Sequence, residues 1–132
     1  MANAIYPKYK EAVLQSSSDS SLGGTVKVAL IDTGTYTYSA SHQYLSDVSG
    51  VVGTAVTLGT KTYTNGTFDA ANVTFTAVSG ATVEAFLVYI DTGVAGTSRL
   101  VYYQDANVTG LPVTPNGGDI NLNFNASGIF TI

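Results

Sequence analysis

The sequence stands out for what it lacks: it has no cysteine and no tryptophan, and only 11% of its 132 residues are charged. Ordinary globular domains carry about 25% charged residues. The absence of cysteine excludes disulfide bonds, thiolate metal ligands and thiol nucleophiles. Lysine and arginine total five and are scattered along the chain, against nine acidic residues, which gives a formal net charge of −4. Such a chain would repel a phosphate backbone, so we expect no nucleic-acid partner.

Long hydrophobic runs are also absent. The longest, Ala85–Ile90, is far shorter than the roughly 20 residues that cross a bilayer. Residues 1–11 lack the apolar stretch of a secretory signal peptide. We therefore expect no membrane partner and no export, and a chain without cysteine is compatible with a reducing cytoplasm.

Neutral polar residues take the place of the missing charges. Thr, Ser, Asn and Gln must supply most of the polar surface, and the mean hydropathy is slightly positive, at +0.21. Because few charges keep the molecule separately soluble, we expect a partner to cover part of its surface. A chain of 132 residues suits a single folded domain.

The first 24 residues differ in pattern from the rest. Pro7 suits the first position of a helix, and four apolar residues at helical spacing predict a short amphipathic helix over Pro7–Gln15. That stripe consists of Ile5, Tyr9, Ala12 and Val13. The sequence SSSDSSLGG over Ser16–Gly24 is typical of a flexible linker. We therefore expect an N-terminal arm and tether over residues 1–24, and a domain over residues 25–132 that folds without them.

From Thr25 onward, short strands alternate with turns. Asn65-Gly66 is typical of a two-residue type I′ hairpin, which would pair Tyr63 with Phe68. Val83–Ile90 is apolar on nearly both faces, as in a central strand, and Ser41 is expected to cap one helical turn over His42–Val48. The pattern predicts an all-β fold, a single antiparallel β-sandwich or jelly-roll-like domain. Its other expected strands cover Thr25–Ile31, Asn72–Val78, Arg99–Asp105, Ile120–Phe124 and Ile129–Ile132.

Asp-Thr-Gly, the signature of aspartic proteases, occurs twice directly after an apolar run, at Asp32 and at Asp91. An aspartic dyad needs two carboxylates that share one proton, contributed by two large lobes or by two subunits. Two loops inside one small domain fit neither arrangement. We interpret both as turns, in which Asp bonds its own backbone and Gly supplies a positive φ.

The remaining candidates for chemistry have structural interpretations as well. His42 is the only histidine, and the neighbouring Ser39 and Ser41 do not make a triad, because a triad requires convergence in space. Asp119–Asn125 places an oxygen-bearing side chain at every second position but lacks the glycine that a calcium loop needs. We interpret it as the solvent face of a strand, and we expect no catalysis, no metal and no cofactor.

Three blocks of the chain carry a resemblance that covers most of its length. They are MANAIYPKYKEAVL (residues 1–14), GTVKVALIDTGTYTYSASHQYLSDV (residues 24–48) and TSRLVYYQDANVTGLPVTPNGGDINLNF (residues 97–124). The chain resembles the capsid cement or decoration proteins of tailed bacteriophages. That resemblance implies a β-sandwich or jelly-roll body on the capsid exterior, where it bridges neighbouring capsomers, assembled in the bacterial cytoplasm. The implied partners are the major capsid protein and further copies of the chain, as a dimer or trimer.

Two groups of residues are candidates for partner contact. The first lies in the arm, which we expect to become ordered on binding, and the second is the TYTY stretch, because tyrosine is favoured at interfaces. Burial on a strand face would explain the second group equally well. The candidates are Ile5, Tyr6, Tyr9, Val13, Tyr36 and Tyr38. Two alternatives stay open: a component of a phage tail or baseplate, and a carbohydrate-binding module, which would use exposed aromatic residues.

Overall fold

Strand β6 (Ala85–Ile90) lies at the centre of the molecule, and all six of its residues are buried. In the computed structural model, which describes residues 3–132, it is the middle strand of a five-stranded antiparallel sheet in the order β1-β7-β6-β2-β3. The other four strands are β1 (Asn3–Ile5), β2 (Val26–Ile31), β3 (Val51–Thr57) and β7 (Leu100–Gln104). The predicted all-β antiparallel class and the central position of this strand are therefore confirmed.

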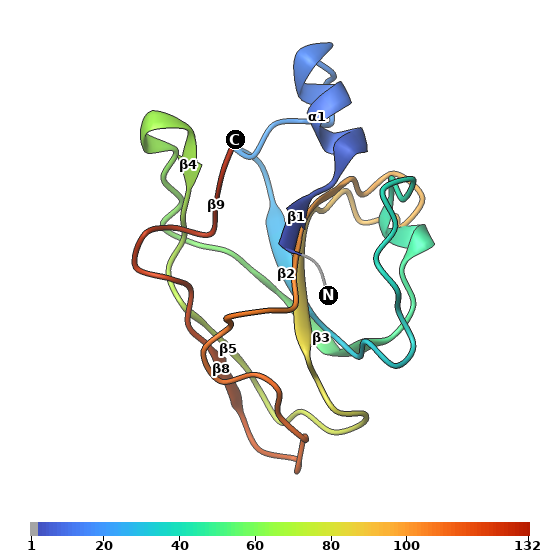
Figure 1. Ribbon diagram of the computed structural model, residues 1–132, viewed down its shortest axis with the longest axis vertical. Coiled ribbons are helices and arrows are strands. Elements are labelled where there is room, and N and C mark those ends of the chain that lie inside the picture. The colour runs from blue at the N-terminus through green and yellow to red at the C-terminus, as the bar shows by residue number, and fades with distance from the viewer. Residues whose placement is uncertain (1–2) are drawn as a thin grey trace.

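Two short strand pairs form a second layer on one side of this sheet (Figure 1). They are β4 (Thr67–Phe68) with β9 (Phe130–Thr131), and β5 (Val73–Phe75) with β8 (Ile120–Leu122). Both pairs turn apolar side chains into the core, because Phe68 and Phe130 are buried on the first and Phe75 on the second. The resulting arrangement is sandwich-like, with part of the hydrophobic core between the sheet and the two strand pairs.

Adjacent tyrosines on β7 mark the two faces of the sheet, because successive side chains on a strand point to opposite sides. Tyr102 faces the second layer and stacks on Phe130, with ring centroids 5.1 Å apart. Tyr103 faces the other way and contacts Tyr36 and Tyr38, at 5.9 and 5.5 Å. The loop over residues 32–50 therefore covers the face of the sheet that points away from the second layer, as Figure 1 also shows.

The predicted Asn65-Gly66 hairpin is confirmed. Both residues have positive φ, 55° and 81°, as a type I′ turn requires. Thr62 and Asp69 exchange backbone hydrogen bonds, and the Tyr63 and Phe68 rings lie 5.8 Å apart. The turn includes a short 3₁₀ segment, η2 (Thr64–Gly66), before β4.

The N-terminal segment is part of the domain, which corrects the prediction of a detached arm. Strand β1 pairs with β7, and the next backbone N–H, that of Tyr6, donates to Val101 O at 2.9 Å. Helix α1 (Pro7–Leu14) follows, close to its predicted bounds, and buries Tyr9 and Ala12. The segment orders here because β7 offers it an open edge.

The serine-rich segment over residues 16–24 is also fixed, against the expectation of a loose tether. Asp19 forms an ion pair with Arg99 at 2.9 Å, and Tyr9 OH donates to Ser20 O at 3.0 Å. The Lys61 ammonium donates to the carbonyls of Leu22 and Gly24. The composition of residues 16–24 resembles that of a linker, but side chains from distant parts of the chain hold this segment in place.

The expected helical turn near His42 also needs correction. The helical turn near His42 is only a 3₁₀ segment, η1 (Leu45–Asp47), which begins after Tyr44 and is not capped by Ser41. Instead, the Asp47 carboxylate accepts the backbone N–H groups of Gln43 and Tyr44, which lower the pKa of Asp47. Neither edge strand of the sheet, β1 or β3, is predicted from the sequence.

Candidate interaction surface

The residues predicted as candidates for partner contact are mostly buried within this chain. Tyr6, Tyr36 and Tyr9 are 0%, 2% and 3% exposed. Ile5 and Tyr38 are half-buried and pack against the same core. Of the six candidates only Val13, at 36% exposure, presents much area to solvent.

The buried tyrosines form a chain of hydrogen bonds that joins two segments of the protein. Tyr6 OH and Tyr36 OH lie 2.7 Å apart, and Tyr36 OH lies 2.8 Å from His42 Nδ1. Burial, with the bond to Tyr36 adding to it, raises the pKa of Tyr6 far above its ordinary value. His42 is therefore the last member of a hydrogen-bond network that joins the residue after β1 to the 32–50 loop. The neighbouring Ser39 and Ser41 hydroxyls bond to each other, 2.9 Å apart.

The two Asp-Thr-Gly loops lie at opposite ends of the sheet. Asp32 follows β2 and Asp91 follows β6, and these strands are antiparallel neighbours. The backbone N–H of Asp91 donates to Thr25 O, so seven residues of strand separate the two aspartates. At roughly 3.3 Å per residue this is about 23 Å, against the roughly 3 Å of a catalytic dyad. The two carboxylates of one copy therefore cannot share a proton.

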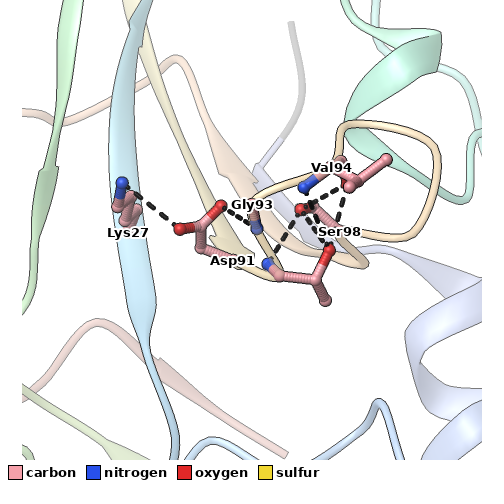
Figure 2. Close-up of polar contacts among 6 residues, drawn as sticks. Lys27, Asp91, Gly93, Val94 and Ser98 are labelled. Atoms are coloured by element: carbon pink, nitrogen blue, oxygen red, sulfur yellow. Dashed lines mark hydrogen bonds and ion pairs between the residues drawn. The ribbon is translucent and has the colours of Figure 1, made fainter.

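Each aspartate instead closes its own turn, as the sequence predicts, but the predicted positive φ occurs only at Gly93 (86°) and not at Gly34. Asp32 accepts the Gly34 N–H at 2.9 Å. Figure 2 shows the second loop, where Asp91 accepts the Gly93 N–H at 3.1 Å and pairs with Lys27 at 3.3 Å. The buried Ser98 hydroxyl accepts the Thr92 N–H and donates to Val94 O. These bonds fix the loop between β6 and β7.

A neutral polar face covers the outside of the second layer. Thr67 and Thr131 lie opposite each other on β4 and β9, with hydroxyls 2.8 Å apart. On the next pair, Thr74 donates to Asn121 Oδ1 at 2.8 Å, while their strand neighbours are buried. The interpretation of Asp119–Asn125 as the solvent face of a strand is thereby confirmed for Asn121, within the shorter strand β8 (Ile120–Leu122). We call Thr67, Thr74, Asn121 and Thr131 the threonine face.

A second exposed feature, not predicted from the sequence, lies at the end of the molecule that carries α1, the start of β2 and the end of β6. We call it the α1 end. Here Leu14 is 86% exposed, Ile132 59% and Tyr63 49%. Leu14 could have been found, because it falls off the apolar stripe of its helix and an amphipathic helix exposes such a residue. The other two adjoin an apolar pocket that only the folded chain creates.

Within residues 3–132, no three residues of the His, Cys, Asp or Glu types come together in a group that could hold a metal ion. Over the same residues, no helix has the length and apolar character needed to cross a membrane. No protein-family model matches the chain, and no curated protein matches its sequence.

Proposed function

We propose that this protein is a non-catalytic structural component of a virion, which binds the outer surface of a tailed-phage capsid and cements neighbouring capsomers. The resemblance in three sequence blocks suggests the class of protein. The observation that carries the proposal is the threonine face, an ordered and outward-facing set of hydroxyl and amide groups. These groups replace the tyrosines of the N-terminal segment as the candidate contact with the major capsid protein.

The chemistry of the threonine face suits a static protein lattice. Hydroxyl and amide groups both donate and accept hydrogen bonds, so they can match backbone or side-chain groups of another protein surface. Their cross-strand pairing holds them in place before binding, which lowers the entropy lost on contact. Each such contact is weak, but linked copies on a lattice bind with far higher combined strength.

A carbohydrate-binding module is the second candidate, favoured by one observation. A small pocket of about 30 Å³ is lined by amide side chains and by Phe86 and Phe124. Amides and aromatic rings are suitable partners for sugar hydroxyls and sugar faces. The pocket holds little more than a water molecule, so it would bind a single protruding group and not a whole sugar ring. This candidate is therefore weaker than the capsid proposal.

Co-sedimentation of the purified protein with intact phage heads tests the proposal. We expect binding to heads that far exceeds binding to isolated capsid subunits, because only the lattice presents adjacent sites. Binding should persist in high salt, since the face is uncharged. Thr74→Glu should weaken it, whereas Thr37→Glu, the same change at an exposed threonine on the opposite side of the sheet, should not.

Three outcomes would contradict the proposal: no binding to heads, binding that collapses in moderate salt, or equal effects of the two substitutions. Binding to tails in place of heads would favour the tail or baseplate alternative. Binding to polysaccharide, abolished by changing the amides of the small pocket, would favour the carbohydrate module.

A further inference from the structure

An apolar pocket opens at the α1 end, the end that also carries the exposed Leu14. Its volume is about 100 Å³. Helix α1 and the turn before β4 both project at this end, with the C-terminus between them (Figure 1). The apolar side chains that line the pocket are Tyr9, Leu22, Tyr63, Phe68, Phe130 and Ile132. An apolar pocket at the surface marks a place where another apolar group would be stabilised.

The same end provides a group of the right size to fill such a pocket. Leu14 is the last residue of α1 and projects away from the buried side of the helix, which carries Tyr9 and Ala12. A cavity of roughly 150 Å³ accommodates benzene, so about 100 Å³ suits a four-carbon side chain. Leu14 cannot fill the pocket of its own chain, because it points to solvent. It is free to enter the pocket of a second copy.

The charges of the molecule decide which of its ends can meet a second copy. At the α1 end, three ion pairs join Lys8 to Glu11, Lys27 to Asp91 and Arg99 to Asp19. Lys10 lies on the same helix, and Lys61 is held against Gly24. All five basic residues of the chain are therefore at or beside this end.

The opposite end, where β2 and β7 terminate and β6 begins, is acidic. It carries four carboxylates and, within the described part of the chain, no basic residue. These carboxylates belong to Asp32, Glu84, Asp105 and Asp119. Two copies that met through this end would bring eight negative charges together. Two copies that met through the α1 end would bring together paired charges and apolar surface.

We propose that the α1 end is a homodimer interface, in which Leu14 of each copy enters the apolar pocket of the other about a twofold axis. A twofold contact uses the same surface on both copies, so it requires a projecting group and a matching pocket on one face. The α1 end has both. The contact covers Leu14, Val13, Tyr63 and Ile132. Thr67 of the threonine face also lines the pocket, whereas Thr74 and Asn121 do not. The proposed interface is independent of the proposed function, since its test uses only the purified chain and no capsid.

Sedimentation equilibrium of the full chain over a wide concentration range tests this inference. We expect a monomer–dimer equilibrium for the native protein. Leu14→Glu should raise the dissociation constant roughly tenfold or more, because a leucine leaves an apolar pocket and a carboxylate is poorly accommodated there. Val94→Glu is the matched control, since Val94 is 60% exposed but does not line the pocket. It should leave the constant unchanged.

Disulfide trapping provides a second readout, because the chain has no cysteine of its own. Mixing Leu14→Cys with Tyr63→Cys protein should give a mixed disulfide dimer under mild oxidation. Mixing Val94→Cys with Tyr63→Cys should give it much more slowly. A native protein that stays monomeric, or equal behaviour of the Leu14 and Val94 variants in either experiment, would overturn the inference.

Discussion

Buried tyrosine hydroxyls in this protein link segments that are distant in sequence. Tyr6 belongs to the N-terminal segment, and Tyr36 and His42 belong to the loop that covers one face of the sheet. A buried hydroxyl without a partner costs about 1–3 kcal/mol. The three groups therefore constrain one another, because a shift of any one would leave another without its bond.

This network predicts an order of destabilisation. Tyr36→Phe removes the middle group and leaves both Tyr6 and His42 without this partner, so we expect a loss of about 2–3 kcal/mol in the free energy of unfolding. Tyr6→Phe leaves the bond between Tyr36 and His42 intact and should cost about 1 kcal/mol. Urea denaturation of both variants measures the order. An equal or reversed order would show that the hydroxyls act independently.

The ion pair between Asp19 and Arg99 predicts a pH dependence. The Arg99 guanidinium holds the pKa of Asp19 below its ordinary value, which is about 3.9 in an unfolded chain. The pair therefore stabilises the fold fully above that ordinary value, and the contribution is lost as pH falls through the lower folded value. Asp19→Asn should cost about 2 kcal/mol at neutral pH, and the difference from the native protein should shrink in acid.

Thermal unfolding of both proteins between neutral and acidic pH measures this effect. Glu11→Gln is the control, because its pair with Lys8 is exposed and surface pairs contribute little. A difference between Asp19→Asn and the native protein that persisted unchanged in acid would contradict the role given to the ion pair.

At the scale of elements, β1 and α1 are held in place by residues that are distant from them in the sequence. Strand β1 bonds to β7, and the Arg99 guanidinium donates to Lys8 O at the start of the helix. An eight-residue helix is marginal in isolation. Its order here comes from packing Tyr9 and Ala12 against the domain.

Removal of residues 1–23 should therefore destabilise the whole domain strongly, in contrast to the expectation from sequence. The deletion takes away an edge strand and the fully buried Tyr6, and it exposes Tyr103 and the open edge of β7. Loss of a large buried side chain alone costs about 3–5 kcal/mol. We expect a much lower melting temperature or aggregation, measured by circular dichroism and light scattering. If the shortened protein melted cooperatively near the melting temperature of the full chain, the original prediction of a separate arm over residues 1–24 and an independently folding domain over residues 25–132 would hold.

The sequence predicts those elements whose conformation depends on residues close together in the chain, such as a tight turn or an apolar strand. Asn65-Gly66 predicts a turn because both residues tolerate positive φ. Val83–Ile90 predicts a central strand because it is apolar on nearly both faces, and the structure places β6 there. The same reasoning failed for residues 1–24. Their partners Arg99 and Lys61 follow them by about 40 to 80 residues in the chain, and no local pattern reveals such contacts.

The candidate surface was less predictable than the fold for a related reason. Tyrosines are favoured at interfaces and are equally suited to a core, so the TYTY stretch did not decide between the two. The threonine face depends on the pairing of β4 with β9 and of β5 with β8, whose partners lie about 45 to 65 residues apart. The apolar pocket likewise exists only where distant segments meet.

For the whole molecule, stability should be distributed unevenly between the two layers. The central strands bond to neighbours on both sides, whereas the second layer consists of two-stranded pairs with two or three residues in each strand. Amides of β6 should exchange with deuterium most slowly, and those of β4 and β9 much faster, because small strand pairs open locally. Native-state hydrogen exchange measures this. Equal protection of β9 and β6 would show that both layers open as one unit.

The separation of charge described above gives each molecule a permanent electric dipole along its sheet strands. Side-chain charges sum to about zero at the α1 end and to −4 at the other, about 23 Å away. Near a negatively charged surface, the electrostatic torque turns the α1 end toward that surface, and near a positive one it turns the acidic end inward. The few charges of this chain therefore contribute little to holding a partner, but they bias the orientation in which the molecule arrives.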